Sequence, residues 1–382
     1  MPTRIFYAPE INLLGAGCLQ KTGTYIKGLS VKKALVVTDA FLNSSGIVKK
    51  VTDMLQANGF LFEIFDQTSP NPTCDQVDMG LSKLQITRCD FIVAVGGGSP
   101  QDCAAAISIL ATNGGNIRSY EGVHKSTKPG LPIVAINTTA GTSAEITINY
   151  VITDENRGVK MVMVDKNALA KVSVSDPELM IGKPAHLTAA TGLDILTHAI
   201  ECFVSKGAYR ITDPLALEAL KIVFDYLPRA VADGNDLEAR EQMVYANFLV
   251  GLAFSNGGLG YVHAMAHQLG GMYDLPHGVC NAMLLPIVQR YNAPYAIKQF
   301  RRMAEVLGIE KGKTDDACTE YVLYRLKALN KTLGIPTSLK ELGIKNPNLD
   351  KMAENALIDT CASGNPFMPT KEQTIAMFKE II

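Results

Sequence analysis

The 382-residue sequence contains no tryptophan and almost no net charge, because 36 lysines and arginines oppose 37 aspartates and glutamates. No field of one sign can arise from that balance, so nucleic acids and anionic membranes are not expected as partners. The first residues lack the basic segment and apolar run of a signal peptide. We also find no apolar run that approaches the ~18–20 residues needed to cross a bilayer. We therefore expect a soluble protein.

Cysteine pairs at the spacing of a metal clip or a redox motif are also missing. The eight cysteines are scattered, and no two of them form C-x-x-C. A chain of this length buries a large core without disulfide staples, so we expect free and mostly buried thiols. This composition predicts the reducing cytoplasm, with a bacterial enzyme microcompartment as the alternative location.

Short β-branched runs alternate with helical patterns in the first half of the chain. Strands are predicted at 34–38, 61–65, 91–95 and 132–136. Uninterrupted apolar runs separated by helices indicate a parallel sheet that is covered on both faces. Right-handed crossovers then give a doubly wound α/β domain. A hairpin is predicted from the runs 148–153 and 159–164.

Strand signals end near residue 183, and helical spacing dominates the rest of the chain. The strongest helical patterns cover 187–204, 214–232, 238–254 and 262–272. We predict an α/β, dinucleotide-binding domain over residues 1–183 and an all-α, metal-binding catalytic domain over residues 184–382. The active site is expected in the cleft between the two domains.

A glycine-rich turn follows the third predicted strand, in the segment Gly96–Asp102. Ser99 is placed to cap the next helix, and Pro100 suits its first turn. Glycines allow close approach of a pyrophosphate, and a helix N-terminus offers free N–H groups to it. The G-x-G-x-x-G fingerprint is absent, so a tight turn with nothing bound is an equal alternative.

Two further segments favour a nucleotide at the same edge of the sheet. Asp39 ends the first predicted strand, where a carboxylate can bind a ribose 2′-OH; a plain helix N-cap is the alternative. The segment Asn137–Glu145 places hydroxyl groups after the fourth strand, where they suit ribose or phosphate. A capping box from Thr142 to Glu145 is the structural alternative for that segment.

The histidines give the sharpest signal, because four of the six lie between residues 198 and 277. Asp194 and His198 are four residues apart on one predicted helix and so share a face, and His263 and His267 repeat this spacing. His277 follows ten residues after His267. His124 and His186 lack such companions and are assigned to surface or structural roles.

A carboxylate and several imidazoles on otherwise apolar helices predict a divalent metal site. Burial of these groups without a cation would be costly. The donor set suits Fe²⁺, Zn²⁺ or Ni²⁺, and the residues do not select among them. The glutamate of H-E-x-x-H is missing, which disfavours a zinc peptidase.

Taken together, these motifs resemble the iron-dependent (group III) alcohol dehydrogenases. The similar segments are Gly96–Asp102, Thr138–Thr142, Ala190–Ala199 and Gly258–His277, and the similarity continues in register over essentially the whole chain. Residues 129–155 are most similar to the lactaldehyde-reducing branch of this family. Met283–Pro286 suits that branch and the 1,3-propanediol dehydrogenases equally.

The resemblance implies a role for specific positions. The implied metal ligands are Asp194, His198, His263 and His277. His267 would lie beside the nicotinamide and the substrate, either as a catalytic proton relay or as a packing residue. The implied cofactor-lining residues are Asp39, Asn71, Gly97, Gly98, Ser99, Asp102, Thr138, Thr139, Thr142, Asn149 and Lys160.

The implied activity is a metal-dependent, NAD(H)-linked alcohol dehydrogenase or aldehyde reductase, with Fe²⁺ expected and Zn²⁺ as the alternative. Lactaldehyde with 1,2-propanediol, or a similar small pair, is the implied substrate, and 1,3-propanediol is the alternative. At least a homodimer is implied, through the N-terminal strand. Ile287 and Phe367 replace a histidine and an arginine that are frequent in the family, which affects the expected substrate and not the chemistry.

Two other functions are compatible with these patterns. A lyase of the dehydroquinate synthase type shares the two-domain plan and the metal. Its polyanionic substrate needs arginines and lysines beside the metal, and the predicted metal-binding segments contain almost none. A metal- and nucleotide-binding sensor without turnover is the second alternative.

Overall fold

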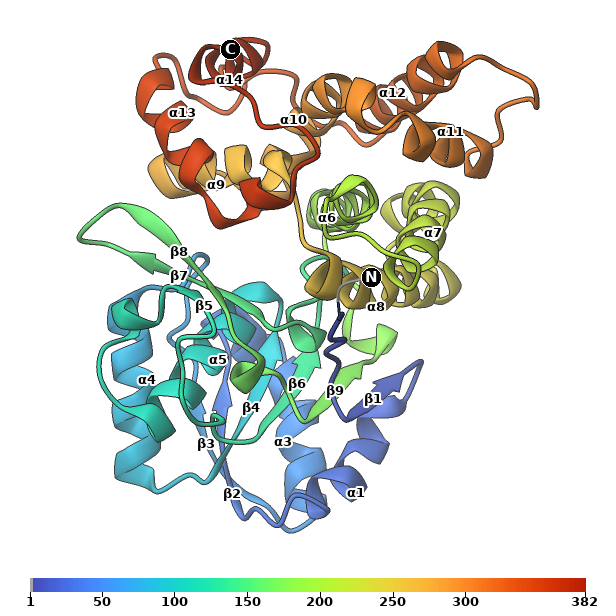
Figure 1. Ribbon diagram of the computed structural model, residues 1–382. Coiled ribbons are helices and arrows are strands. Elements are labelled where there is room, and N and C mark those ends of the chain that lie inside the picture. Colours follow the sequence, from blue (N-terminus) through green and yellow to red (C-terminus); the bar gives the residue numbers. More distant parts are fainter. Residues whose placement is uncertain (1–2) are drawn as a thin grey trace. The chain divides into compact units, whose positions relative to one another are not determined.

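The computed structural model describes residues 3–382 and separates into two compact units. The first unit ends at Ile181, and the second is Gly182–Ile382. The sequence pattern placed this boundary after residue 183. The first unit contains α/β structure and the second is helical, as the sequence predicts (Figure 1).

A six-stranded parallel sheet forms the centre of the first unit. Its strands lie in the order β1-β9-β6-β4-β2-β3. Their bounds are β1 Ile11–Leu14, β2 Lys33–Val37, β3 Leu61–Phe65, β4 Phe91–Gly96, β6 Ile133–Asn137 and β9 Val172–Ser175. Strands β2, β3, β4 and β6 are those predicted from the sequence, whereas β1 and β9 were not predicted. Both of these have only four residues, and β9 is a Val-Ser alternation without a long apolar run.

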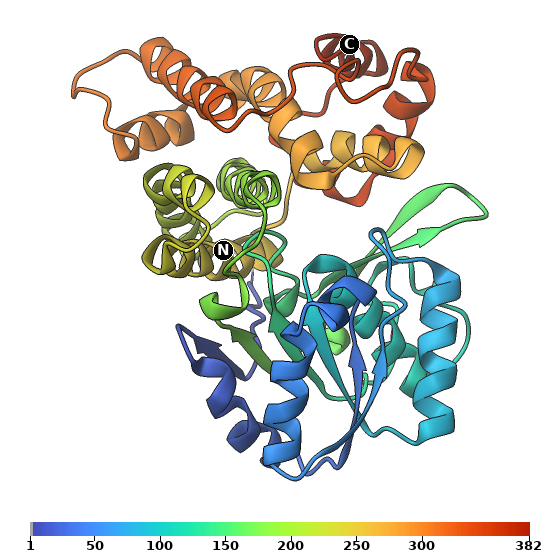
Figure 2. The same ribbon diagram turned by 180° about the vertical axis from the view of Figure 1, so that it is seen from behind.

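Helices cover both faces of this sheet, and alternate strand residues point to opposite sides. Leu35 and Val37 of β2 pack with α4 (Cys74–Thr87) and α5 (Gly98–Asn113). Ala34 and Val36 pack on the other face, with α1 (Thr22–Lys27) and α3 (Ile47–Ala57). Figures 1 and 2 show these two faces of the unit. The doubly wound prediction is confirmed.

Two local expectations in this unit are wrong. The helix predicted from Asp39 onward is divided into α2 (Ala40–Ser44) and α3, because Gly46 adopts a left-handed conformation with φ 87° between them. Ser99 does not cap α5, because that helix already begins at Gly98, with Gly97 as an N-cap that makes no side-chain hydrogen bond.

A second, three-stranded sheet completes the first unit. The predicted hairpin is β7 (Asn149–Asp154) paired antiparallel with β8 (Val159–Val164), and β5 (Gly122–Val123) adds a short parallel edge. The buried Asp154 beside the turn accepts hydrogen bonds from Arg118 at 3.0 Å and Arg157 at 2.5 Å. These contacts hold the hairpin against the loop that precedes β5.

The second unit contains nine α-helices among the residues that the structure describes. They are α6 Ala185–Val204, α7 Thr212–Ala232, α8 Leu237–Gly257, α9 Tyr261–Tyr273, α10 His277–Asn292, α11 Ile297–Val306, α12 Asp315–Thr332, α13 Leu349–Ile358 and α14 Lys371–Lys379. The 3₁₀ segments of the two units are η1 Cys18–Lys21, η2 Ile117–Tyr120, η3 Ala144–Ile146, η4 Lys166–Ala168, η5 Pro177–Leu179, η6 Ala293–Tyr295 and η7 Thr360–Gly364.

Helix α6 corrects the expectation that no apolar segment reaches membrane-spanning length. An 18-residue window within its 20 residues has a mean hydropathy of 1.3, so the helix is long and apolar enough to cross a bilayer by length and composition alone. However, 89% of that window is buried inside the protein, and the helix carries buried Asp194, His198 and Glu201. Its apolar character is therefore that of a core helix.

Candidate metal and nucleotide sites

Helix α6 supplies three ionisable side chains from one of its faces. Asp194, His198 and Glu201 follow one another at intervals of one helical turn, and all three are buried, with Glu201 fully inaccessible to solvent. Such groups are tolerated in a core only when partners satisfy them. The partners come from α9 and α10.

His263 of α9 and His277 at the start of α10 converge on Asp194. The Nε2 atoms of His263 and His277 each lie 3.6 Å from Asp194 Oδ1. The ring of His198 stacks on that of His263, with centroids 4.5 Å apart. Three of the four predicted ligands therefore present donor atoms to a common centre, and the fourth lies in ring contact with one of them.

Close helix packing makes this convergence possible. Gly278 follows His277, and a Cβ at Gly278 would lie only 2.2 Å from the backbone oxygen of Ala190 on α6. Only glycine allows the start of α10 to approach α6 this closely. The motif His277-Gly278 therefore combines a donor with the residue that brings it into place.

Asn281, which was not singled out from the sequence, lies among these donors. Its Nδ2 atom donates to Asp194 Oδ1 at 2.7 Å and lies 3.2 and 3.1 Å from the Nε2 atoms of His263 and His277. The side chain is fully buried on the first turns of α10, one turn after His277. Its amide therefore orients the same carboxylate oxygen that faces both imidazoles.

Glu201 is the second residue that was not predicted from the sequence. Its carboxylate lies 2.5 Å from His263 Nδ1 and accepts a hydrogen bond from the backbone N–H of Val262 at 2.5 Å. An ionised carboxylate only accepts, so Nδ1 of His263 carries a proton, and Nε2 is the ring nitrogen that faces Asp194. The spacing of Asp194, His198 and Glu201 on one helical face is the signal that could have identified it.

The charges of the cluster stabilise one another. Burial by itself would raise the pKa of Asp194, but the adjacent His198, His277 and His263 outweigh it and hold that pKa well below its usual range. Burial likewise opposes a charge on His263, yet Asp194 and Glu201 raise its pKa to about 9. A divalent cation bound at Nε2 of His263 could take the place of the proton that these carboxylates favour there.

His267 lies one turn after His263 and has its own carboxylate partner. Its Nδ1 is 2.9 Å from Asp359 Oδ2, and its ring stacks at 5.6 Å on that of His277. Burial opposes ionisation of Asp359, but His267 outweighs it and lowers the pKa of this carboxyl. The hydrogen bond leaves Nε2 of His267 for exchange with other groups.

The predicted nucleotide residues gather at the carboxyl edge of the parallel sheet. Asp39 follows β2, Gly97 and Gly98 follow β4, and Thr138 follows β6, and these three strands are neighbours in the sheet. A Cβ on Gly97 would lie 3.0 Å from Thr139, and one on Gly98 would lie 3.0 Å from Thr142. The glycine turn and the hydroxyl-rich segment are therefore adjacent, with no room for side chains between them.

Other predicted positions are placed by the hairpin. Lys160 of β8 donates to Asn71 Oδ1 at 2.7 Å, so these two predicted residues meet. Asp102 lies in the first turns of α5, where burial raises its pKa to about 8 against the opposing effects of Val151 and Lys160. Ser99 lies in the first turn of α5, and Asn149 begins β7.

The structural alternatives for two of these residues have different outcomes. Asp39 does cap α2, accepting from Leu42 N at 2.8 Å. The capping box from Thr142 to Glu145 is wrong, because η3 has Ser143 as its N-cap without a side-chain bond. Glu145 is buried and instead binds Asn137 at 3.0 Å. The buried Glu145 carboxylate thus accepts a hydrogen bond from Asn137, the first residue of the hydroxyl-rich segment.

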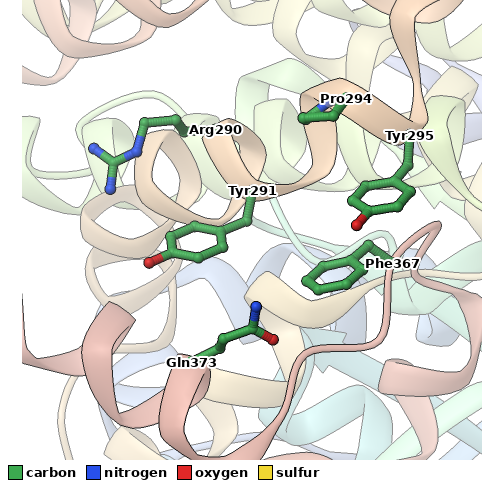
Figure 3. Close-up of a pocket in the computed structure, with 6 residues that line it drawn as sticks. All are labelled: Arg290, Tyr291, Pro294, Tyr295, Phe367 and Gln373. Atoms are coloured by element: carbon green, nitrogen blue, oxygen red, sulfur yellow. The ribbon is translucent and has the colours of Figure 1, made fainter.

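Phe367, one of the two departures noted in the sequence, lies away from these donors. It stacks on Tyr295 with ring centroids 4.6 Å apart, and both line a pocket with Arg290, Tyr291, Pro294 and Gln373 (Figure 3). None of the predicted metal, cofactor or catalytic residues lines this pocket. Ile287, the other departure, is buried on α10.

Comparisons with known proteins cover nearly the whole chain. Residues 9–177 match the family described as iron-containing alcohol dehydrogenase, and residues 188–382 match the C-terminal part of the Fe-containing alcohol dehydrogenase family. The chain is similar in structure to a crystal structure of 1,3-propanediol oxidoreductase, with a TM-score of 0.97, 44% identity and full coverage of both chains.

Several relatives are similar over most or all of their lengths. Alcohol dehydrogenase 4 of Schizosaccharomyces pombe is 46% identical, covering 99% of this chain and 89% of the relative. NAD-dependent methanol dehydrogenase of Bacillus methanolicus is 43% identical, covering 99% of each. Lactaldehyde reductase of Escherichia coli K12 is 42% identical, covering 97% of each.

Proposed function

The chain belongs to the iron-containing alcohol dehydrogenase family, and from that premise we propose that it uses Fe²⁺ and NAD(H) to interconvert a small uncharged alcohol and its aldehyde. Interconversion of alcohols and aldehydes with the help of a metal is the activity of the family. For this chain we propose the specific metal, the residues that line the cofactor and the substrate. The convergence of Asp194, His263 and His277 is the observation that carries the proposal.

The donor set fits a divalent metal. In a tetrahedral site with bonds of about 2.0–2.1 Å, neighbouring donor atoms lie roughly 3.4 Å apart. Asp194 Oδ1 is 3.6 Å from the Nε2 atoms of His263 and His277, so these donors need to move by only a few tenths of an ångström. We assign Asp194, His198, His263 and His277 as the ligands. Carboxylate and imidazole suit Fe²⁺, and Zn²⁺ suits them as well.

The edge of the parallel sheet supports NAD(H) as the hydride carrier. Gly97 and Gly98 precede and open α5, so a pyrophosphate can approach the free N–H groups of its first turn. Asp39 at the end of β2 favours a ribose with a free 2′-OH and repels a 2′-phosphate. We therefore propose NAD(H) over NADP(H), with Asn71, Ser99, Asp102, Thr138, Thr139, Thr142, Asn149 and Lys160 as the other lining residues.

The metal, when bound, supplies Lewis-acid polarisation of the alcohol or carbonyl oxygen, and the nicotinamide accepts or donates the hydride. The residues of the chain prepare this chemistry. Glu201 accepts from Nδ1 of His263, so Nε2 is the nitrogen that is left to bind the metal. His267 is held by Asp359 through Nδ1, and its Nε2 can pass the alcohol proton toward solvent as a relay.

The electrostatics of the helical unit favour an uncharged substrate. Asp194, Glu201 and Asp359 surround the imidazoles, and within residues 3–382 none of them pairs with a lysine or an arginine. A polyanionic substrate of the dehydroquinate type would be repelled there. The named relatives act on methanol or lactaldehyde by their names, so identity alone does not select among short substrates. We propose lactaldehyde with 1,2-propanediol as the first pair to test.

The test is oxidation of NADH by metal-stripped protein that is reloaded with Fe²⁺ without oxygen, using lactaldehyde and propanal. We expect turnover to return with Fe²⁺ and to be lost in His263→Ala, which lacks a ligand. The same protein without added metal is the control. Tight binding of metal and NADH without turnover of any short aldehyde would contradict the proposal and favour a sensor or a lyase.

Assembly and location are further proposals. Strand β1 forms one edge of the six-stranded sheet, so its outer backbone groups are available for pairing with a second chain. This supports the homodimer through the N-terminal strand that the family resemblance implies, and sedimentation analysis of the purified protein tests it. A cytoplasmic location, with no nucleic acid or membrane partner, is consistent with eight cysteines that remain as thiols in the described part of the chain.

A further inference from the structure

A second group of metal-binding side chains lies in the helical unit beside the predicted iron ligands. His267 of α9, Asp359 and Cys361 present an imidazole nitrogen, a carboxylate oxygen and a thiol sulfur that all lie within 4.8 Å of one another. Asp359 is the N-cap of η7, and Cys361 is in its first turn. None of these atoms belongs to the cluster of Asp194, His198, His263 and His277.

The local backbone holds this group in place. Asp359 Oδ1 accepts from the backbone N–H of Cys361 at 2.9 Å, while Oδ2 faces His267 Nδ1 at 2.9 Å. One carboxylate thus ties the thiol-bearing turn to the imidazole. The side chains of His267 and Asp359 are 8% and 7% exposed, so both are largely buried but keep some access to solvent.

Within residues 3–382, no lysine or arginine pairs with the Asp359 carboxylate. The hydrogen bonds that Asp359 accepts come from the His267 imidazole and from the backbone N–H and thiol of Cys361. Cys361 also feels the negative charge of Asp359 and Glu201. A divalent cation would balance this charge, and the mixture of sulfur, nitrogen and oxygen donors suits Zn²⁺.

We propose that His267, Asp359 and Cys361 form a second cation site that takes Zn²⁺ and that inhibits the enzyme when filled. In tetrahedral zinc sites the donor atoms lie roughly 3.3–3.8 Å apart, so donors that lie within 4.8 Å of one another have to close by up to about 1 Å. The Cys361 thiol releases its proton to the buffer as the Zn–S bond forms, and the proton that Nδ1 of His267 donates to Asp359 moves to Nε2 by exchange with solvent. The ion replaces the hydrogen bond between His267 and Asp359, and solvent supplies the fourth ligand.

Inhibition follows from the use of His267, and this part rests on the proposed function. With Nδ1 bound to zinc, the imidazole is no longer oriented by Asp359, and its remaining proton lies on Nε2. Nε2 then has no lone pair with which to take up the alcohol proton. The metal at Asp194, His198, His263 and His277 remains in place. Zinc would therefore act on an enzyme that is already loaded with iron.

Titration of the metal-stripped protein with Co²⁺ tests the site without any turnover. The first equivalent is expected at the carboxylate–imidazole cluster, and a second equivalent is expected to bring a near-ultraviolet sulfur-to-cobalt charge-transfer band. Cys361→Ser should remove the band, and Asp359→Asn should weaken the second equivalent. Cys318→Ser is the matched control, because Cys318 is a buried thiol on α12 outside the group. Binding of one equivalent only, or a band that survives in Cys361→Ser, would overturn the site.

Zinc inhibition of the iron-loaded enzyme tests the second half of the proposal. In Cys361→Ser the zinc concentration for half inhibition should rise more than ~10-fold, because a soft thiolate ligand is lost. The effect is measured as the ratio of rates with and without zinc, so a change in the starting rate does not obscure it. Zinc that binds without lowering turnover overturns the inhibitory role. Absence of turnover before zinc is added would instead contradict the proposed function.

Discussion

The predicted nucleotide site of the α/β unit and the predicted metal site of the helical unit consist of different chemical groups. In the α/β unit, the predicted nucleotide edge consists of backbone N–H groups, glycines and hydroxyls. A Cβ on Gly97 or Gly98 would lie 3.0 Å from Thr139 or Thr142. In the helical unit, the predicted metal centre consists of buried carboxylates and imidazoles that satisfy one another. One feature depends on backbone shape and the other on buried charge.

This difference determines how each feature should respond to mutation. A backbone cradle has many small contributions, so one added methyl group should change binding moderately. A buried ionic cluster is coupled, so removal of one member leaves the others without a partner. We therefore expect steep effects in the helical unit and shallow ones at the edge of the sheet.

The largest effect is expected at His267. If its Nε2 relays the alcohol proton, His267→Ala should lower turnover by roughly 10²–10⁴-fold while the metal stays bound. Rapid kinetics with NADH and an aldehyde, together with metal analysis, measure both quantities. Asp359→Asn should produce a smaller loss of the same kind, since the imidazole remains but loses its orienting carboxylate. Near-normal turnover in His267→Ala would assign it a packing role only.

A smaller effect is expected at Glu201, which contacts the predicted ligand His263 without being a predicted ligand itself. Groups that orient a metal ligand typically change metal affinity by about 10–100-fold when they are altered. Glu201→Gln should show this loss in a chelator competition assay. Glu145→Gln is the matched control, because Glu145 is a similarly buried carboxylate in the α/β unit. Equal loss of metal affinity in both variants would exclude a positioning role for Glu201.

A still smaller effect, on NADH affinity, is expected at Gly98 of the predicted nucleotide site. A Cβ there would lie 3.0 Å from the Cγ2 methyl of Thr142. Gly98→Ala should weaken NADH binding about 10-fold, a size typical of mild overpacking, with metal affinity unchanged. The double variant Gly98→Ala/Thr142→Ser removes the opposing methyl group and should recover most of the affinity, as titration of NADH fluorescence can show. Failure of this rescue would mean that the clash is not the cause.

The last prediction concerns stability and not activity, because Asp102 makes the free energy of unfolding depend on pH. Burial raises its pKa from 3.8 to about 8, so the folded state keeps a proton that the unfolded chain releases. The free energy of unfolding therefore falls as the pH rises from 3.8 through about 8. Asn has no carboxyl to ionise, so Asp102→Asn does not lose stability in this way. The free energy of unfolding of the variant minus that of the parent should therefore grow between pH 3.8 and about 8, and then stay constant. If Asp102 is not responsible, urea unfolding at several pH values would show a constant difference between the two proteins.

Much of the architecture follows from local patterns. The four predicted strands, the hairpin and the helices of the second unit come from apolar runs and helical spacing, which short segments carry in themselves. Strands β1 and β9 were missed because four residues carry little periodicity and their pairing partner is far away in the sequence. The division of α2 from α3 was missed because the left-handed conformation of Gly46 depends on context.

For the candidate site too, local patterns in the sequence predicted only some of the residues. Asp194, His198, His263, His267 and His277 could be singled out from residue type and spacing, because several imidazoles and a carboxylate are rarely buried on apolar helices unless they bind a cation. Glu201 and Asn281 could not be identified as their partners, since a glutamate or an asparagine on a helix has many ordinary roles. Their contacts exist only where α6, α9 and α10 meet.

Residue chemistry and spacing along the chain were thus enough to predict the fold class and a divalent metal site, and the motifs carried the resemblance to the family. Each of these depends on residues that are near one another in the sequence. The contact of Glu201 with His263, the contact of Asn281 with Asp194, and the meeting of Cys361 with His267 and Asp359 emerged only from the folded chain. These relations join residues that are separated by up to about a hundred positions, and packing, not local pattern, brings such residues together.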